Sequence, residues 1–483
     1  MKKAILSVFV LTLGVVHAQQ ESDYYPIFDM QAPEGEVVEV GGIDLGPDGA
    51  LYVCTRHGDI WRIQDPFGDA PEWNIWARYL HEPLGLGWHD GWLYATQRPE
   101  VTRMKDEDGD GRADVFECVS SGWGISGDYH EYAFGTRPDA EGNIWVTLCL
   151  TGSFSPNTLF RGWVMRVNII SGDCVPTACG VRSPGGIGFG PDGKVYYTDN
   201  QGTWNGSSSM KYVSVGSFQG NPNGHAFFPF ANNVIGSEPP HPDYGNNGSL
   251  TVTAREKIPT YVPPALMLPH GKMGQSPTGI ESDHSKGKFG PFAGQVFIAE
   301  QTHSQVHRAY LEEVNGVMQG AAFPFLNGFK SGNIGLRITD NGTLFTGGSN
   351  RGWGARGGQA FNCERVTWTG KVPFEVHEMR AKPDGFELTF TQPVDKESIK
   401  SDSFSMEAWT YQYKKGYGSP EVEKVTPTVS VGHVSSDGKT VRLNVEPLTR
   451  GHVHGLNLSG VKHPDGHGLL HPKAYYTLNE IPK

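Results

Sequence analysis

The sequence GGIDLGPDGALYVC at residues 41–54 returns in nearly the same form as GGIGFGPDGKVYYT at residues 185–198. In each copy, a Gly and an apolar residue lead into a Pro-Asp-Gly turn, and the turn leads into a strand rich in Leu, Val or Tyr. Four further copies read GLGWHDGWLYAT from Gly85, YAFGTRPDAEGNIWVT from Tyr132, the split pair TGIESD from Thr278 and AGQVFIAE from Ala293, and GLRITDNGTLFTG from Gly335. The copies recur at intervals of roughly 45 residues to nearly twice that. Six such hairpins predict a six-bladed β-propeller with one four-stranded blade per copy.

The propeller is predicted at residues 36–370, after an N-terminal linker at residues 19–35. A stretch dense in Gly, Pro and Asn at residues 220–269 is interpreted as a long loop between the fourth and fifth blades. Loops of this length are often functional, although a plain insertion is an equal alternative. Beyond Lys371, short alternating strands and Asp-Gly turns predict a small C-terminal β-sandwich, Ig-like, at residues 371–483. The fold class is therefore all-β.

The first 18 residues have the pattern of a secretory signal. Lys2 and Lys3 precede an apolar stretch at residues 4–16, which is too short to span a bilayer. Cleavage is predicted after Ala18, and the mature protein is expected to be secreted or periplasmic. No later segment is apolar enough to predict a transmembrane segment.

Charge and cysteine content narrow the possible partners. The formal net charge of −12 disfavours binding to phosphate backbones, so nucleic acid is not an expected partner. The six Cys residues are compatible with disulfides in an oxidising compartment. Cys174 and Cys179 are predicted to pair, and Cys118 and Cys149 are a second candidate pair. No Cys-x-x-Cys-His motif occurs, so the chain does not attach its own c-type haem.

An acidic loop that begins at Asp106 with DEDGDG predicts a calcium site. Oxygen ligands at loop positions 1, 3, 5, 9 and 12, together with a Gly at position 6, fit the spacing that wraps a calcium ion. The predicted ligands are the side chains of Asp106, Asp108, Asp110, Asp114 and Glu117 and the backbone carbonyl of Arg112. The alternative is a solvated acidic turn. The histidines of the C-terminal domain are interpreted as solvated, with a metal site as the less favoured alternative; they are His452, His454, His463, His467 and His471.

Polar residues recur where the inner strands of the blades are expected to begin or end. A His with several Arg residues around one axis suits an anionic ligand together with a general base. Each residue alone could instead hydrogen-bond nearby backbone. The candidates are Arg56, His57, Gln97, Arg98, His130, Glu131, Arg182, Asp199, Asn200, Gln201, Arg337 and Arg351.

At these residues the chain resembles the glucose/sorbosone dehydrogenase family, whose members are six-bladed propellers that use pyrroloquinoline quinone (PQQ) with calcium. It is more similar still to an exported branch of this family found in Planctomycetes and their relatives. The domain of that branch is called membrane-bound dehydrogenase-like. The resemblance covers about residues 36–370 and extends into the C-terminal domain. The segments that carry it are LYATQRPEVTRMKDEDGDGRAD at 93–114, YYTDNQGTW at 196–204, RGWGARGG at 351–358 and ERVTWTGKVPFEV at 364–376.

The resemblance implies roles for particular residues. His130 matches the base that takes the proton from the sugar hydroxyl. Arg182 and Arg337 match arginines that contact the carboxylates of the quinone, and Lys272 is a looser match to a lysine that contacts the cofactor. Asp199 and Gln201 are also predicted to bind the cofactor. The family's calcium loop beside the quinone is not recognisable in the segment that follows Asp199.

These observations favour an exported, PQQ-type oxidoreductase that acts on a carbohydrate or another small polyol. Its electrons would pass to a separate acceptor such as a c-type cytochrome. One alternative is a carbohydrate-binding propeller without catalytic activity. Another is a metal-dependent lactonase or similar hydrolase, which would need Glu, Asn and Asp side chains converging on an axial metal. The fold alone does not decide between them, because propellers host many functions.

Overall fold

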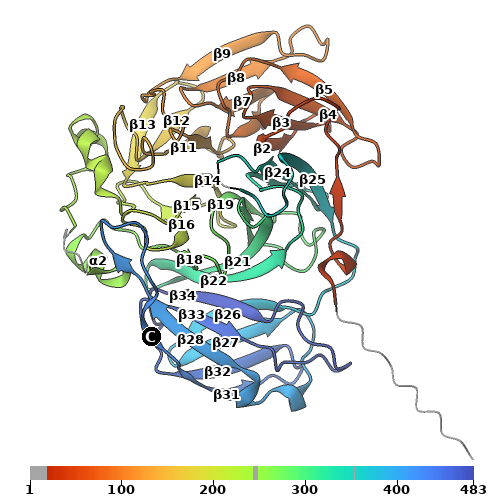
Figure 1. The fold of residues 1–483 in the computed structure, drawn as a ribbon, viewed down its shortest axis with the longest axis vertical. Coiled ribbons are helices and arrows are strands. Elements are labelled where there is room, and N and C mark those ends of the chain that lie inside the picture. Colours follow the sequence, from red (N-terminus) through yellow and green to blue (C-terminus); the bar gives the residue numbers. More distant parts are fainter. Residues whose placement is uncertain (1–18, 243–248, 353) are drawn as a thin grey trace, which may run out of the picture.

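The computed structural model of the protein describes residues 19–242, 249–352 and 354–483. Six antiparallel blades surround a central axis, and a β-sandwich lies against one side of the ring (Figure 1). The signal peptide predicted at residues 1–18 lies outside the described residues. Among the described helices, none is both long and apolar enough to cross a membrane.

In each of the first five blades, the strands run from the axis outward in chain order. The first two blades consist of β2 (Val40–Leu45), β3 (Leu51–Thr55), β4 (Ile60–Gln64) and β5 (Glu72–Ala77), then β6 (Leu86–His89), β7 (Trp92–Thr96), β8 (Val101–Lys105) and β9 (Val115–Ser120). The third and fourth consist of β10 (Ala133–Gly135), β11 (Asn143–Leu148), β12 (Trp163–Asn168) and β13 (Cys174–Cys179), then β14 (Pro184–Phe189), β15 (Val195–Asp199), β16 (Ser208–Val213) and β18 (Leu266–Leu268). The fifth consists of β19 (Pro277–Ser282), β20 (Val296–Glu300), β21 (Gln305–Val314) and β22 (Val317–Leu326).

The sixth blade closes the ring with the N-terminal part of the chain. It consists of β23 (Gly335–Ile338), β24 (Thr343–Ser349), β25 (Phe361–Thr367) and β1 (Ile27–Asp29). Strand β1 pairs with β25, with Ile27 opposite Val366. The 3-10 helix η1 (Glu21–Asp23) precedes it. The segment predicted as a linker at residues 19–35 therefore supplies the outer strand of a blade, which was not apparent because β1 has only three residues.

Glycines of the repeated motif allow the inner strands to approach each other at the axis. A Cβ atom on Gly85 of the second blade would lie 2.5 Å from the carbonyl oxygen of Gly135 in the third. A Cβ atom on Gly185 of the fourth blade would lie 2.1 Å from the carbonyl oxygen of Pro277 at the start of the fifth. Both distances are far below a normal carbon–oxygen contact, so any larger residue would push neighbouring blades apart. The Gly that opens these copies is thus required by packing between blades.

The long insertion lies inside the fourth blade rather than between the fourth and fifth blades, as the sequence had suggested. It separates β16 from β18, the outer strand of the same sheet. The prediction was wrong because β18 has only three residues, too few for a recognisable alternation. The insertion contains η2 (Pro222–Phe230), α1 (Asn232–Ile235), β17 (Ser249–Leu250) and α2 (Thr251–Lys257).

The C-terminal domain is a sandwich of two sheets, as predicted, but it is not separate from the ring. One sheet is β26 (Val376–Lys382), β27 (Gly385–Phe390), β32 (Thr440–Glu446) and β31 (Thr428–Val434). The other is β34 (Lys473–Leu478), β33 (His452–Asn457), β28 (Ser405–Thr410) and β30 (Val422–Val425). The remaining short elements are η3 (Lys396–Ser398), η4 (Ser401–Ser403) and β29 (Gln412–Tyr413), which pairs with β17.

Strand β34 continues the fifth blade. Ala321 of β22 lies opposite Tyr476 of β34, so the two domains share one eight-stranded sheet. Without this pairing, the outer edge of the fifth blade would present unpaired backbone groups. The sandwich core also includes Tyr310 and Phe323 of that blade. Side chains from both domains therefore form one continuous apolar core.

Two of the C-terminal histidines are buried and a third, His471, is half-buried, contrary to the interpretation that they are solvated. His454 and His452 lie on β33 and are 0% and 4% exposed. Burial, with a smaller contribution from His452, lowers the pKa of His454 to about 3. His471 contacts Glu375 and Glu21 at 2.6 Å and 2.9 Å. Burial alone would lower its pKa, but these carboxylates raise it to about 9. The alternation of β33 explains the burial, since His452 and His454 lie on the same face of that strand.

Candidate functional site

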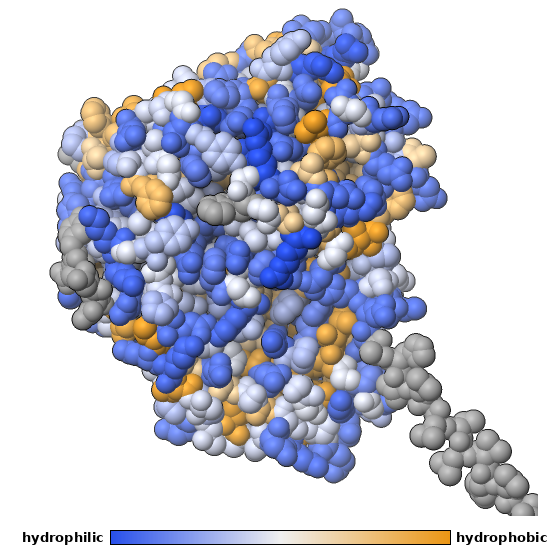
Figure 2. Space-filling model, in the orientation of Figure 1, coloured by the Kyte–Doolittle hydropathy of each residue, from blue (hydrophilic) through white to orange (hydrophobic). Residues whose placement is uncertain are grey.

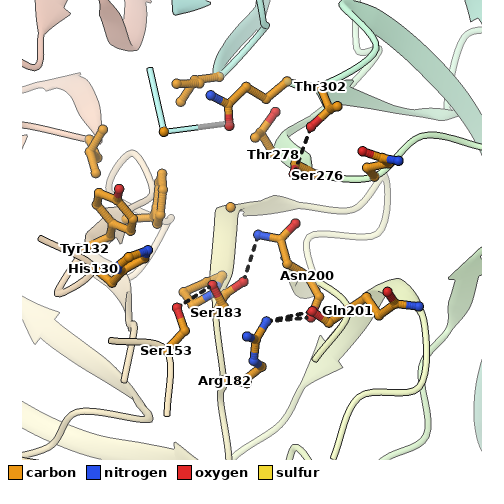
Figure 3. Close-up of a pocket in the computed structure, with 18 of the residues that line it drawn as sticks. His130, Tyr132, Ser153, Arg182, Ser183, Asn200, Gln201, Ser276, Thr278 and Thr302 are labelled. Atoms are coloured by element: carbon orange, nitrogen blue, oxygen red, sulfur yellow. Dashed lines mark hydrogen bonds between the residues drawn. The ribbon is translucent and has the colours of Figure 1, made fainter. Parts of the chain in front are cut away.

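A cavity of about 480 Å³ opens at the end of the ring where the inner strands begin and the second strands end. Arg182 and Pro184 come from the start of β14, and Asn200 and Gln201 follow the end of β15. Residues at equivalent places in other blades complete the wall, including His130, Ser276 and Thr302, which Figure 3 labels. Arg56 and Arg351 also line it. This recurrence follows from the antiparallel order of the blades, which brings these strand ends to a single face. The volume lies within the usual range for small-molecule sites.

Arg56, which follows β3, lies beneath two tyrosines. Its side chain is 5% exposed, and its guanidinium carbon lies 5.4 Å from the ring centroid of Tyr132 and 5.6 Å from that of Tyr129. Among the described residues, neither Nε nor Nη2 of Arg56 has a hydrogen-bond partner. Leaving charged donors buried and unpaired is costly, so this side chain is suited to receive an anionic ligand.

Arg182, which precedes β14, is held by backbone oxygens and aromatic rings. Its Nη1 donates to the carbonyls of Gln201 at 2.8 Å and Asn200 at 3.3 Å. The rings of Tyr417 and Phe154 lie 5.0 Å and 5.5 Å from its guanidinium carbon. Within the described part of the chain, Nε of Arg182 is buried without a partner, and neither Arg182 nor Arg56 has a carboxylate within 4.0 Å. Arg182 is thus a fixed cation whose charge is not neutralised by the protein.

His130 lies on the segment before β10 and lines the same cavity. Its Nδ1 atom is 3.8 Å from a carboxylate oxygen of Asp128, and its ring is 4.9 Å from that of Tyr129. Burial alone would raise the pKa of Asp128, but the backbone N–H groups of His130 and Gly152 donate to its carboxylate and hold the pKa below its usual range. The carboxylate beside His130 is therefore ionised near neutral pH and suited to orient the imidazole.

The C-terminal domain supplies part of the cavity wall through a loop between β29 and β30. The backbone N–H of Gly418 in this loop donates to the carbonyl of Gly202 at 2.9 Å, and the N–H of Trp204 donates to the carbonyl of Lys414 at 2.9 Å. These bonds place Tyr417 at the rim, where its side chain is 57% exposed. Its ring lies 6.4 Å from that of Phe154, which is also exposed. The rim therefore presents aromatic surface next to the arginines.

The described part of the cavity wall contains cations and neutral groups but no Asp or Glu. Arg351 is the lining arginine that does have a carboxylate partner, because its Nη1 lies 3.2 Å from Oε2 of Glu39, which is not among the lining residues. The face seen in Figure 2 is mostly hydrophilic, with apolar side chains scattered across it. The cavity thus carries a local positive charge on a protein whose net charge is −12.

Gln201 lies in the cavity wall, whereas Asp199 does not. Asp199 is fully buried behind the wall, where one carboxylate oxygen lies 2.9 Å from Nζ of Lys211. The other accepts a hydrogen bond at 2.9 Å from the backbone N–H of Ser183, which does line the cavity. The structure therefore gives Asp199 a supporting position.

Arg337 and Lys272 also lie away from the cavity. Arg337 is at the opposite end of the central channel, where it pairs with Asp44 at 2.8 Å and Glu281 at 2.7 Å. Lys272 lies against the C-terminal domain, with Nζ 2.7 Å from Glu421 and 3.9 Å from the ring centroid of Trp409. Both cations are neutralised where they are, so neither is placed to contact a ligand in the cavity.

The acidic loop between β8 and β9 gathers three of the predicted calcium ligands. Carboxylate oxygens of Asp106, Asp108 and Asp114 lie within 4.8 Å of one another. Gly109 and Gly111 have φ values of +78° and +91°, which favour glycine, and their N–H groups donate to Asp106. Asp110 accepts a hydrogen bond from the backbone N–H of Arg112.

Glu117 is not part of this group. It lies on β9 and pairs with Arg103 of β8 at 2.5 Å. The predicted position-12 ligand was wrong because the chain enters a strand after Asp114, whereas the EF-hand spacing assumes a helix.

The predicted disulfides are not formed. All six cysteines are free thiols in the described structure. Cys174 and Cys179 are the first and last residues of β13, so an extended strand separates them. A disulfide requires Cα atoms within about 7 Å, and a strand rises about 3.3 Å per residue. Cys149 is buried beside Ser153, while Cys118 is exposed on another blade.

Comparisons with solved structures find the same fold in two proteins whose titles name a glucose dehydrogenase and a carbohydrate-active enzyme family. The putative oxidoreductase (glucose dehydrogenase) from Thermus thermophilus has a TM-score of 0.51 and 18% identity, over 71% of this chain and 99% of that chain. The iodide structure of a Trichoderma reesei member of Carbohydrate-Active Enzymes Family AA12 has a TM-score of 0.50 and 13% identity, over 72% and 96% of the two chains. No protein-family model and no curated protein matches the chain. The likeness confirms the predicted all-β propeller fold, and the Planctomycetes branch stays a prediction.

Sequence reasoning missed several residues of the cavity. Tyr129 and Tyr132 flank His130 in sequence, so their aromatic character next to a candidate base was an available signal. His270 lies in the connection from β18 to β19, between the fourth and fifth blades, and no motif marked it. Tyr417 could not have been found, because no sequence pattern indicates that a loop of the C-terminal domain reaches the mouth of the ring.

Proposed function

We propose that the protein is an oxidoreductase that binds PQQ, or a closely related quinone carrying several carboxylates, in the cavity at the mouth of the ring. The observation that carries this proposal is the pair of buried arginines, Arg56 and Arg182. Each has at least one guanidinium nitrogen without a hydrogen-bond partner among the described residues, and no described residue of the cavity wall is Asp or Glu. A planar ligand with several carboxylates matches such a wall in charge, and the flanking tyrosines match it in shape.

Arg56 and Arg182 would hold the carboxylates, and Gln201 would offer a further polar contact from the wall. Arg351 would contribute at the outer edge, although Glu39 partly neutralises it. When bound, the quinone would supply the acceptor for the two electrons that leave the substrate carbon. The electrons would pass on to a separate acceptor, such as a c-type cytochrome, because the chain has no haem-attachment motif.

His130 would act as the base toward the substrate hydroxyl. Since Asp128 lies beside Nδ1, the proton would be taken at Nε2, and the ionised carboxylate would stabilise the imidazolium that results. Removing such a base typically lowers the rate by about 10²- to 10⁴-fold.

The substrate would be a carbohydrate or another small polyol. Tyr129, Phe154 and Tyr417 form an exposed aromatic rim, and such rings stack against the apolar faces of sugar rings. If the predicted signal sequence at residues 1–18 directs export, this activity would take place in the periplasm or outside the cell. Calcium would bind separately, at Asp106, Asp108 and Asp114.

The same rim favours a second candidate, a carbohydrate-binding protein without catalytic activity. The third possibility, a metal-dependent lactonase, has less support, because the described cavity wall offers no carboxylate for a metal ion.

The test is reconstitution of the full chain with PQQ and calcium, followed by measurement of the absorbance of the protein-bound quinone and of sugar-dependent dye reduction. We expect one bound quinone per chain and turnover with at least one sugar. His130→Ala should lose about 10²- to 10⁴-fold in turnover while it retains the quinone. His433→Ala, which removes an exposed histidine of the sandwich, is the matched control. Sugar binding without quinone binding would instead establish the non-catalytic alternative.

A further inference from the structure

The insertion of the fourth blade brings together three side chains that no part of the proposed function uses. His225 lies on η2, and Glu238 and His241 lie on the segment after α1. Each offers one ligand atom, and these atoms all lie within 4.8 Å of one another. The three residues are spread over 17 positions of an irregular segment, so the chain must fold back on itself to bring them together.

The spacing of the three groups matches that of ligands around a small metal ion. Nδ1 of His225 is 3.4 Å from a carboxylate oxygen of Glu238, and Nε2 of His241 is 3.6 Å from the same oxygen. Ligand atoms about 2.0–2.1 Å from a tetrahedral zinc ion are about 3.3–3.4 Å apart. The two rings lie 4.7 Å apart in an edge-on arrangement, so both can face a common point.

His225 is the observation that distinguishes this group from a chance surface cluster. The residue is 4% exposed and packs against Phe218 and Phe228, with ring centroids 5.0 Å and 5.7 Å away. Among the described residues, neither of its ring nitrogens has a hydrogen-bond partner. A buried imidazole without partners is costly, and a metal ion bound at Nδ1 would satisfy one of the two nitrogens.

We propose that His225, Glu238 and His241 bind a divalent transition-metal ion of the zinc class. Two imidazoles and one carboxylate are a donor set for zinc, whereas calcium takes oxygen ligands in larger number. Water or a further ligand would complete the coordination. The site is chemically distinct from the all-oxygen group at Asp106, Asp108 and Asp114.

The metal would join η2 to the segment after α1, and η2 itself contacts the third blade beside the cavity. The carbonyl of Gly224, next to His225, accepts a hydrogen bond at 2.7 Å from Nε1 of Trp163 in the third blade. The side chain of Asn223 donates to the carbonyl of Phe154 at 2.5 Å, and the ring of Phe154 lies over Arg182. An ion at His225 would therefore stabilise the part of η2 that supports the cavity rim.

The test is a zinc titration of the full chain after chelator treatment, in the presence of saturating calcium so that the acidic loop is filled. A chain carrying His463→Gln and His467→Gln serves as the parent, because a second His-Asp-His group lies at His463, Asp465 and His467. Zinc affinity is measured by competition with a chromophoric chelator, and the melting temperature is recorded with and without zinc.

We expect the parent to bind one zinc ion tightly and to melt at a higher temperature when it is bound. His241→Gln and Glu238→Gln alter exposed side chains, so both variants should fold. Each should weaken zinc binding by more than about 100-fold. Losing a residue that only hydrogen-bonds to a metal ligand typically costs about 10- to 100-fold, and these residues are proposed as ligands themselves. His284→Gln, which removes an exposed histidine of the fifth blade, should leave the affinity unchanged. A parent that binds no zinc, or unchanged affinity in both ligand variants, overturns the proposal.

Discussion

The two ends of the central channel both carry arginines, but the arginines are paired with carboxylates at one end only. At one end, Arg137 and Arg337 surround Glu281, with Arg337 also 2.8 Å from Asp44. At the other end, Arg56 and Arg182 have no carboxylate within 4.0 Å among the described residues. The paired end narrows to a space of about 70 Å³, and the unpaired end opens to about 480 Å³.

The difference shows why an arginine near a propeller axis is not by itself a ligand-binding residue. Arg337 satisfies its charge within the fold, so its role is to join the first, fifth and sixth blades. Arg182 obtains only two carbonyl oxygens and two aromatic rings from the protein. A cation left in that state suits an external anion.

The largest effect should come from removing the cation at the paired end. Arg337→Leu leaves Asp44 and Glu281, which are 3% and 5% exposed, without their main partner. Losing one partner of a buried ion pair typically costs about 3–5 kcal/mol, so we expect a loss of stability of that size in urea unfolding. Quinone affinity, measured where the variant is folded, should be nearly unchanged. If Arg337→Leu had normal stability and weakened quinone binding, Arg337 would be a ligand-binding residue, and the distinction between the two ends would be wrong.

Calcium removal should also act on stability, at the acidic loop beside the first blade. That loop shares a surface groove with Asp48 and Arg62. Binding to the native state alone stabilises a protein by about 2.7 kcal/mol at a ligand concentration 100 times Kd. A chelator should therefore lower the melting temperature, and Asp108→Ala should remove most of that response. Asp402→Ala, an exposed carboxylate of the sandwich, is the control. A full chelator response in Asp108→Ala would place the ion elsewhere.

At the unpaired end, the expected effect is on ligand affinity rather than stability. Hydrogen bonds to charged groups contribute about 1.5–3 kcal/mol, so Arg182→Gln should weaken quinone binding by about 10- to 150-fold. Its melting temperature should stay close to that of the parent, because no protein carboxylate loses a partner. Arg166→Gln removes an arginine that lies over Trp145, away from the cavity, and should bind the quinone normally. Equal affinities of Arg182→Gln and the parent would exclude the site assignment.

The smallest expected effect is a pH-dependent loss of folding stability at His471, a third place where charges are paired. Glu375 and Glu21 raise the pKa of its imidazole to about 9 against burial, which acts in the other direction. The stabilisation is fully present below the unfolded pKa near 6.5 and is lost as pH rises through about 9. We expect a loss of about 2 kcal/mol between pH 7 and 9, since each pKa unit corresponds to about 1.4 kcal/mol. Denaturant unfolding across that range should show the decline, and His471→Gln should flatten it.

The repeated Gly-turn-strand motif was sufficient to predict the propeller, because each copy carries the turn and the inner strands of one blade. The sequence did not reveal β1 and β18, which have three residues each and obtain their place from pairing with longer strands. The misassigned linker and the misplaced insertion arise from these two strands. The join between β22 and β34 was hidden for a related reason, since strand pairing between distant segments leaves no local pattern.

The candidate site was predicted in part. His130, Arg182 and Gln201 lie together because the ends of inner and second strands meet at one face, which the repeat alone implies. Arg337 was misplaced because it lies two residues into β23, nearer the far end of that strand than its start. Lys272 pairs with Glu421, and Asp199 pairs with Lys211, so neither side chain faces the cavity. Contacts between residues distant in the chain cannot be inferred from sequence spacing.

The backbone ladder from β19 to β30 has a consequence for how such proteins can diverge. Strand β34 pairs with the edge strand β22, and the loop between β29 and β30 places Tyr417 at the cavity rim. The sandwich therefore cannot be exchanged like an independent domain. A recombined gene that paired this ring with a foreign tail would expose a strand edge and alter the binding surface in the same event. Ring and tail are therefore expected to be inherited together and to change in concert.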